Sequence, residues 1–99
     1  MSLWMDRDTM SKYLADKVIV VTGAGSGFGK LIAQKCAAGG AKVVGLDVNE
    51  EALSKAFEDI RAAGMEGAAQ VADVTSLPQV RTAVQKTIDI YGAIDVMVN

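Results

Sequence analysis

Four glycines occupy alternate positions from Gly23 to Gly29, and they follow a β-branched run at residues 18–21. A continuous β-branched run is typical of a strand whose two faces are both covered by helices. Glycine allows a sharp turn and a close approach between backbone segments. We therefore predict that a buried strand, a tight glycine turn and a helix follow one another in this part of the chain.

Apolar residues at helical spacing define the segment after the glycine turn. Four of them fall at i, i+3, i+4 and i+8: Phe28, Leu31, Ile32 and Cys36. We expect these residues to form one buried stripe of a helix that ends at Gly39 and Gly40, because glycine commonly terminates a helix.

A second strand and helix are expected next. The strand is predicted at Lys42–Asp47, and the helix after it should end at Gly64. The buried positions of this helix recur at helical spacing: Leu53, Phe57 and Ile60.

A third strand, a third helix and a fourth strand complete the pattern. The strand at residues 67–72 precedes a helix that Ser76 can cap. Pro78 falls in the first turn of this helix, where backbone amides have no partner within the helix, so its missing amide costs no hydrogen bond. The inner stripe of this helix is expected to end before Gly92 and to consist of Val80, Val84, Ile88 and Tyr91. The last strand is predicted at residues 94–98.

Strands and helices alternate throughout residues 17–99, which is typical of βαβ units on a parallel sheet. Crossovers between parallel strands are right-handed, so the expected strand order is 3-2-1-4. The predicted fold class is α/β: a Rossmann-like parallel sheet with helices on both faces, truncated after the fourth strand. That strand would lie at an open edge, which invites pairing with another chain.

Composition argues against several classes of function. Ten basic and twelve acidic residues leave a net charge of −2 without a basic cluster, so neither nucleic acid nor a membrane is an expected partner. The chain has no histidine and a single cysteine, Cys36, which favours a reducing, cytoplasmic location and no metal site. Residues 1–16 are expected to form an N-terminal tail, because their charges and lack of an apolar run exclude a signal peptide or membrane anchor.

The glycine turn is suited to an anion. Its backbone N–H groups can point at a ligand, and the dipole of the following helix adds a partial positive charge at the same place. A pyrophosphate fits this environment, and a connector with only a conformational role is the alternative. A P-loop is excluded, because Ala24 stands where its first glycine belongs and Leu31 follows Lys30 in place of a hydroxyl residue.

Four positions of the turn fit the spacing T-G-x-x-x-G-x-G: Thr22, Gly23, Gly27 and Gly29. This pattern resembles the short-chain dehydrogenase/reductase family. Phe28 replaces the more usual isoleucine, and we expect its apolar side chain to pack behind the loop. The resemblance covers residues 17–99 and implies that they are the N-terminal part of a dinucleotide-binding Rossmann domain.

Asp47 ends the second predicted strand, twenty-four residues after Gly23. An acid at this place can accept both hydroxyls of the adenosine ribose and repels the extra phosphate of NADP. The family tends to carry a basic residue in the glycine loop when it uses NADP, whereas this chain has Ser26. The expected cofactor is NAD, with NADP less favoured, unless Asp47 is only a solvated loop carboxylate or the cap of the next helix.

Two more features resemble the family. Asp73 and Val74 follow the third predicted strand, where the family has a carboxylate that accepts the adenine amino group and a residue that packs on the ring. Asp73 could equally cap the following helix. Asn99 resembles the start of the family's N-N-A-G segment, although an asparagine at a strand end can also be a turn residue. The candidate cofactor-binding residues are therefore Thr22, Gly23, Ser26, Gly27, Phe28, Gly29, Asp47, Asp73, Val74 and Asn99.

The resemblance implies an NAD-dependent oxidoreductase that transfers hydride between the cofactor and an alcohol or carbonyl substrate. The family's catalytic serine, tyrosine and lysine lie beyond the equivalent of Asn99, so no residue of this chain is expected to be catalytic. The expected partners are a small-molecule substrate of the whole protein and further copies of the same chain. The alternative is a non-catalytic dinucleotide-binding or regulatory module that a partner completes at the open edge strand.

Overall fold

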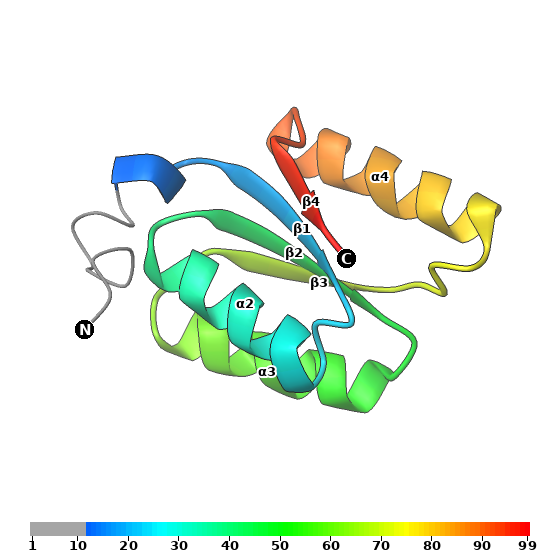
Figure 1. The fold of residues 1–99 in the computed structure, drawn as a ribbon, viewed down its shortest axis with the longest axis horizontal. Helices are drawn as coiled ribbons and strands as arrows, with labels where there is room; N and C mark the ends of the chain where they lie inside the picture. Colours follow the sequence, from blue (N-terminus) through cyan, green and yellow to red (C-terminus); the bar gives the residue numbers. More distant parts are fainter. Residues whose placement is uncertain (1–11) are drawn as a thin grey trace.

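The computed structural model describes residues 12–99, which fold into a parallel four-stranded sheet with helices on both faces (Figure 1). The elements, in chain order, are β1 (Val18–Thr22), α2 (Gly27–Ala38), β2 (Lys42–Asp47), α3 (Glu50–Ala62), β3 (Gly67–Val71), α4 (Leu77–Tyr91) and β4 (Val96–Val98). The strand order is β3-β2-β1-β4, so the predicted order 3-2-1-4 is confirmed. Most of the predicted tail, residues 1–11, lies outside the described part of the chain.

β1 is an inner strand of the sheet and pairs in parallel with both β2 and β4. In this register Val20 lies between Val44 of β2 and Met97 of β4. β2 pairs in parallel with β3 on its other side. Because all four strands run the same way, the segments that follow β1, β2 and β3 meet at one edge of the sheet (Figure 1).

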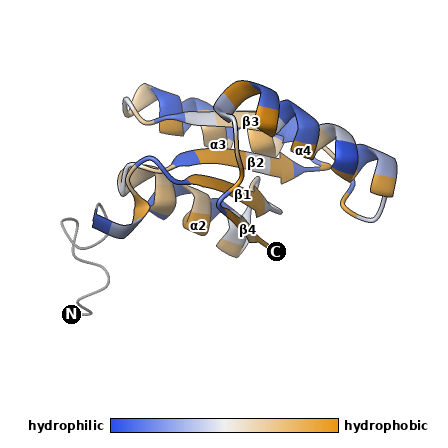
Figure 2. Cartoon of the chain, turned by 90° about the horizontal axis from the view of Figure 1, so that it is seen from above, coloured by the Kyte–Doolittle hydropathy of each residue, from blue (hydrophilic) through white to orange (hydrophobic). Residues whose placement is uncertain are grey.

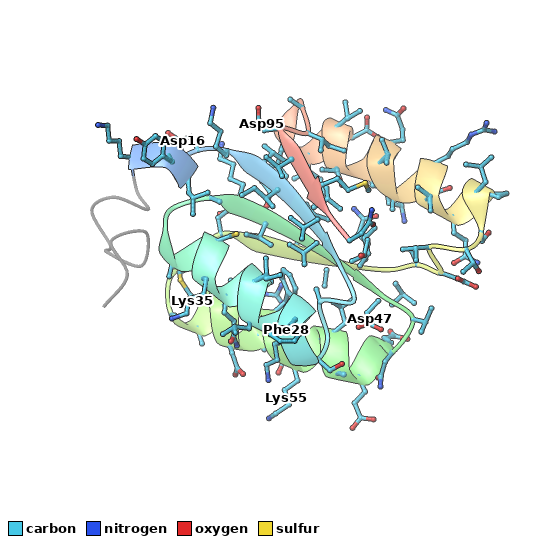
Figure 3. The ribbon with its side chains drawn as sticks, in the orientation of Figure 1. Asp16, Phe28, Lys35, Asp47, Lys55 and Asp95 are labelled. Carbon is cyan, nitrogen blue, oxygen red and sulfur yellow. The ribbon has the colours of Figure 1, made fainter. Side chains whose placement is uncertain are left out.

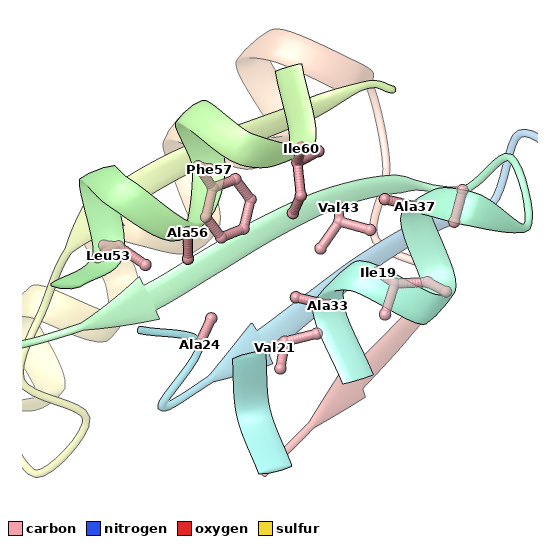
Figure 4. Packing of buried hydrophobic residues seen from close by; sticks show 11 residues of the cluster. Ile19, Val21, Ala24, Ala33, Ala37, Val43, Leu53, Ala56, Phe57 and Ile60 are labelled. Carbon is pink, nitrogen blue, oxygen red and sulfur yellow. The ribbon is translucent and has the colours of Figure 1, made fainter. Parts of the chain in front are cut away.

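Helices α2 and α3 cover one face of the sheet (Figures 1 and 4). Ile19 and Val21 of β1 point to this face, as the alternation of side chains along a strand requires. The buried cluster there is completed by Ala24, Ala33, Ala37, Ala41, Val43, Leu53, Ala56, Phe57 and Ile60. Figure 2 shows β1 and β2 in hydrophobic colours between helices of mixed hydropathy, so the sheet forms the centre of the core.

Helix α4 covers the other face of the sheet (Figure 1). Val20 points to this side, opposite to its neighbours in β1, and the cluster around it consists of Val44, Leu46, Ala72 and Ala83. At the end of the sheet, Val96 and Met97 of β4 remain 46% and 42% exposed. Because consecutive residues of a strand point to opposite faces, β4 is only partly covered on both sides.

Phe57 has the largest fully buried side chain, with 0% of it exposed. Its ring lies against Gly45 in the middle of β2, where a Cβ atom would overlap the ring. A Cβ atom at Gly67 of β3 would approach the ring to 3.0 Å. Two paired strands therefore use glycine to make room for one aromatic ring of α3.

Two of the four residues predicted for the apolar stripe of α2 are not buried. Ile32 and Cys36 pack against the core, but Phe28 is 83% and Leu31 47% exposed. The buried residues of this helix are Ala33 and Ala37. Small side chains let the helix approach the sheet closely, so its buried face is centred on alanines. The expectation that Phe28 packs behind the loop is therefore wrong.

The inner stripe predicted for α4 also differs from the structure. The fully buried positions are Ala83 and Thr87, and the Thr87 hydroxyl donates to the Ala83 carbonyl oxygen at 2.8 Å. Ile88, expected inside, is 39% exposed. The other predicted members, Val80, Val84 and Tyr91, are half-buried. A buried threonine that bonds to its own helix is invisible to a search for large apolar residues, so the pattern misplaced this face.

The ends of β3 and β4 and the cap of α4 differ slightly from prediction. β3 ends at Val71 and β4 begins at Val96. Ser76 is the N-cap residue of α4, but its side chain makes no capping hydrogen bond. Asp95 explains the late start of β4, because its Oδ2 accepts from the Val18 amide at 2.8 Å while its own amide donates to the Val18 carbonyl at 2.9 Å.

Tyr91 is expected to make stability pH-dependent in the alkaline range. Its hydroxyl donates to Glu66 at 3.0 Å, and burial followed by this hydrogen bond raises the pKa of the phenol from 10.0 to about 12. The resulting stabilisation of the neutral phenol is complete below pH 10 and is lost as the pH rises towards 12. Tyr91→Phe should therefore show a smaller decline over this window in urea unfolding, and parallel declines would contradict the assignment.

Candidate functional site

The carboxyl ends of β1, β2 and β3 open onto a hollow of about 280 Å³. Its lining consists of Gly23, Leu46, Asp47, Val48, Ala72, Asp73 and Val74. Four of these residues were predicted from the sequence as site residues: Gly23, Asp47, Asp73 and Val74. Figure 3 shows Asp47 at this edge, near the N-terminal end of α2 that carries Phe28. The fold thus assembles one concave site from three separate loops.

The glycine turn between β1 and α2 needs glycine for two different reasons. Gly23 and Gly27 have φ angles of +63° and +57°, in the left-handed region that side chains disfavour. A Cβ atom at Gly29 would overlap the Gly23 carbonyl oxygen, so α2 begins in direct contact with the turn. The Ala24 amide donates to the Leu46 carbonyl at 3.1 Å, which ties the turn to β2.

The N-terminus of α2 lies at the same edge. Ser26 is the N-cap residue and makes no side-chain cap, and the Lys30 amide donates to the Ser26 carbonyl at 3.2 Å. The amides of the preceding first turn have no partner within the helix. Because this turn contains no acidic residue, the positive end of the helix dipole is not neutralised. The arrangement can bind a phosphate group through main-chain amides.

Asp47 connects the end of β2 to the glycine turn. Its Oδ2 accepts from the Gly25 amide at 2.9 Å, and its Oδ1 accepts from the Asn49 amide at 3.0 Å. A Cβ atom at Gly25 would lie 2.8 Å from this Oδ2 and 3.1 Å from the Leu53 nitrogen. Asn49 caps α3 by accepting from the Ala52 amide, so the alternative of Asp47 as the helix cap is wrong. Each Asp47 oxygen keeps a second lone pair that can accept from a ligand hydroxyl.

Asp73 borders the hollow after β3. Its Oδ1 accepts from the Thr75 hydroxyl at 2.7 Å and from the Thr75 amide at 2.9 Å. The side-chain bond, followed by the backbone bond, lowers the pKa of the Asp73 carboxyl below its usual value. The charged, acceptor form therefore persists to lower pH. Because Ser76 is the N-cap of α4, Asp73 does not cap that helix.

Two valines give the hollow an apolar surface. Val74 is 49% exposed and Val48 is 65% exposed, and both line the hollow. Val74 was predicted as a site residue, whereas Val48 was missed although it directly follows Asp47 in the sequence. Exposed valines beside carboxylates suit a ligand that is flat and apolar on its faces and polar at its edges.

Thr22 and Asn99 meet where β1 and β4 end. The Thr22 hydroxyl lies 3.3 Å from the Val98 carbonyl oxygen and 3.5 Å from Asn99 Oδ1. Neither Thr22 nor Asn99 lines the hollow, but both stand at the edge of the sheet where the glycine turn begins. Thr22 and Asn99 therefore lie at the same edge of the sheet as the other candidate residues but do not line the hollow.

Gln79 makes a contact that the sequence analysis missed. Its Oε1 accepts from the Asp73 amide at 2.9 Å, across the loop between β3 and α4. A signal for it exists in the sequence, because Gln79 stands three residues after Ser76, the spacing at which a glutamine reaches back over a helix start.

No group of three or more histidine, cysteine, aspartate or glutamate side chains within residues 12–99 could hold a metal ion. None of the helices in the described part of the chain is long and apolar enough to cross a membrane. Cys36 is half-buried against the core, and burial raises the pKa of its thiol. Cys36 is therefore a packing residue and not a reactive thiolate.

Residues 17–99 match the family model described as short chain dehydrogenase. Among curated relatives, an uncharacterized oxidoreductase of Thermotoga maritima is 43% identical over 86 residues, which make up 87% of this chain and 34% of the relative. The match to the family model therefore extends from the start of β1 to the end of β4.

Two solved structures share this architecture. A short chain dehydrogenase/reductase from Burkholderia phymatum in complex with NAD has a TM-score of 0.83 and 38% identity, over 85% of this chain and 30% of its own. An actinorhodin polyketide ketoreductase with NADPH has a TM-score of 0.81 and 33% identity, over 95% of this chain and 33% of its own. The chain spans about a third of the length of the proteins it matches. Because the family model matches most of its residues, the chain belongs to the short-chain dehydrogenase family.

Proposed function

We propose that the site binds the adenosine and pyrophosphate groups of NAD. The chain would provide this site to an oxidoreductase that transfers hydride between NAD and an alcohol or carbonyl substrate. One observation carries the proposal: the Asp47 carboxylate lines the hollow and at the same time holds the glycine turn. The NAD complex of the Burkholderia phymatum relative supports it.

The pyrophosphate is assigned to the glycine turn and the first turn of α2. The main-chain amides there have no helical partner, and the helix dipole favours a negative charge. Gly27 and Gly29 keep side chains out of this approach, and Thr22 and Asn99 delimit the turn on the side of β4. Phe28 contributes its main-chain amide, because its side chain is exposed.

The adenosine ribose is assigned to Asp47. A carboxylate that already accepts from two main-chain amides is held in place and can still accept from two vicinal hydroxyls. The same negative charge would repel a phosphate at the ribose 2′ position, and Ser26 offers that phosphate no cation. We therefore propose NAD over NADP.

The adenine ring is assigned to the surface formed by Asp73 and Val74. Val74 provides apolar contact area for a ring face, and the Asp73 carboxylate can accept from an amino group. The two residues are adjacent in the chain and line the same hollow as Asp47. One concave surface would then hold both the base and the ribose.

The bound cofactor supplies the hydride at its nicotinamide ring. The residues of this chain bind and orient the other half of the cofactor, and we assign the proton-transferring serine, tyrosine and lysine of the family to residues beyond Asn99. Turnover of an alcohol by the 99-residue chain alone would contradict this division of roles.

Isothermal titration of NAD and NADP into the chain and its Asp47→Asn variant tests the proposal. Asparagine carries no charge and can still accept from the Gly25 amide through its one oxygen, although it loses the bond from the Asn49 amide, so the variant removes repulsion of the phosphate while the bond to the turn is kept. We expect the wild type to prefer NAD by at least about tenfold, which is ~1.4 kcal/mol, and the variant to bind both within about threefold.

Asp59→Asn is the matched control, because Asp59 is exposed on α3 and does not line the hollow. It should keep the preference of the wild type. Equal affinities of the wild type for NAD and NADP, or an unchanged preference in Asp47→Asn, would contradict the assignment of Asp47.

We also propose a cytoplasmic homo-oligomer that acts on a small alcohol or carbonyl compound. The single cysteine, Cys36, is suited to a reducing compartment. The exposed Val96 and Met97 of β4 offer apolar surface for further protein. Light scattering after size-exclusion chromatography should show a defined oligomer, and a monomer at all concentrations would contradict this part of the proposal.

A further inference from the structure

We propose that Gln79 is a positioning residue that makes the site selective for adenine over hypoxanthine. This inference rests on the adenine assignment made above for Asp73 and Val74. Gln79 would act through the main chain of Asp73 and not by touching the base, since it does not line the hollow of the site.

Asp73 is held by hydrogen bonds on almost all of its polar atoms. Its amide donates to Gln79 Oε1 at 2.9 Å, and its carbonyl accepts from the Ser76 amide at 3.0 Å. Its Oδ1 accepts twice from Thr75. Only Oδ2 is left without a partner among residues 12–99. The loop thus presents one free carboxylate oxygen in a defined position.

The bond from Asp73 to Gln79 is not an ordinary helix cap. A glutamine three residues after an N-cap serine usually accepts from the amide of that serine. Here the Ser76 amide already donates to the Asp73 carbonyl, and the Ser76 side chain makes no cap. Gln79 instead reaches past the helix start to Asp73. The glutamine therefore anchors the loop of the site and not the first turn of α4.

Gln79 reaches the Asp73 amide from α4 and does not line the cofactor hollow. Its side chain lines a second hollow of about 450 Å³ between β3 and α4, together with Gln70 and Thr82. Asp73 and Val74 line the first hollow and not the second, and the bond from the Asp73 amide to Gln79 Oε1 joins the two regions. Loss of this support would let the free oxygen and the Val74 surface move relative to each other.

Adenine and hypoxanthine differ at the group that Asp73 would contact. The adenine amino group donates to a carboxylate, whereas the hypoxanthine carbonyl presents an acceptor and is repelled by it. A discrimination of this kind depends on the carboxylate being held within a fraction of an ångström. Gln79 should therefore control the ratio of the two affinities more than either affinity alone.

The experiment measures the affinities of NAD and nicotinamide hypoxanthine dinucleotide for the wild type, Gln79→Ala and Gln79→Glu. Glutamate keeps an acceptor oxygen and should rescue the effect. Gln85→Ala is the matched control, because Gln85 lies on the same helix and its side chain bonds only to Asp89 within the described residues. The wild type should prefer NAD by at least about tenfold, and Gln79→Ala by less than about threefold. Gln79→Glu and Gln85→Ala should keep the preference.

A second measurement needs no cofactor. Exchange of the Asp73 amide proton with solvent should be slow in the wild type and in Gln79→Glu, and faster in Gln79→Ala. An equal exchange rate in all three proteins would overturn the role of Gln79 even if every dinucleotide bound.

The outcomes separate the two proposals. If the wild type binds neither dinucleotide, or binds both equally, the adenine assignment fails and the role of Gln79 falls with it. If the wild type discriminates and Gln79→Ala discriminates equally well, only the positioning role of Gln79 is overturned. A loss of stability in Gln79→Ala with an unchanged affinity ratio would also overturn it, because that is the effect of a purely structural contact.

Discussion

Replacing Phe57 by alanine is expected to lower the free energy of unfolding by about 3–5 kcal/mol. The ring is completely buried between α3 and the sheet, against Gly45 and Gly67. Neither glycine has a side chain that could move into the space, so the cavity would collapse poorly. Urea unfolding followed by circular dichroism measures the loss.

Phe28→Ala is the matched control, since the same substitution falls on a ring that is 83% exposed. Its cost should lie within about 0.5 kcal/mol of zero. Phe57→Leu fills part of the cavity and should cost less than Phe57→Ala, which keeps the comparison measurable if the alanine variant does not fold. Equal losses for Phe57→Ala and Phe28→Ala would contradict the packing of α3 on the sheet.

Gly29→Ala is expected to weaken dinucleotide binding on the order of 10- to 100-fold, because loss of a hydrogen bond to a charged group costs about 1.5–3 kcal/mol. The new Cβ atom would overlap the Gly23 carbonyl oxygen and lie 2.9 Å from the Thr22 carbonyl oxygen. Both obstacles are backbone atoms, so α2 must move away from the turn. The first-turn amides would then leave the position proposed for the pyrophosphate.

Gly64→Ala is the control for Gly29→Ala. Gly64 has a φ of +77° with open space around its Cβ position, and it lies after α3, before the amino end of β3. It should cost about 1–2 kcal/mol of stability through backbone strain but leave the affinity unchanged. An unchanged affinity in Gly29→Ala, measured by isothermal titration on folded protein, would contradict the role given to the glycine turn.

The order of the strands was predictable because it depends on patterns that extend over many residues. Strand β2 matches its predicted bounds, and α3 buries the three residues expected from their spacing, Leu53, Phe57 and Ile60. α3 buries large side chains, which dominate a hydropathy pattern. Handedness of the crossovers then determines which strands are neighbours. Long-range pairing could therefore be inferred without any knowledge of individual contacts.

The buried faces of α2 and α4 were not predictable in the same way. Both helices contact the sheet through small residues, such as Ala33 in α2 and Ala83 in α4. Alanine carries little hydropathic signal, and the larger Phe28 and Ile88 lie outside the contact. A pattern search follows the large residues, whereas close packing selects the small ones.

The candidate site residues could be placed at one edge of the sheet from their spacing, but their supporting bonds could not. Asp47 and Asp73 each follow a strand, so their meeting at one edge of the sheet follows from the topology. The bonds from Asp47 to Gly25 and from Gln79 to Asp73 depend on loop conformation, which sequence spacing does not specify. These bonds determine where each carboxylate points, and the selectivity proposed for the site depends on them.

Titration of the ¹⁵N-labelled chain with NAD, followed by NMR, tests most directly whether this edge of the sheet binds the cofactor. The glycine amides report on both ends of the molecule. The amides expected to shift are those of the turn: Gly23, Gly25, Gly27 and Gly29. The amides expected to stay unchanged precede the amino ends of β2, β3 and β4: Gly40, Gly64 and Gly92. Shifts at the turn glycines, Phe28, Asp47, Asp73 and Val74, with none at Gly40, Gly64 and Gly92, are the predicted result. Shifts at the opposite end, or none at saturating NAD, would contradict the proposed function.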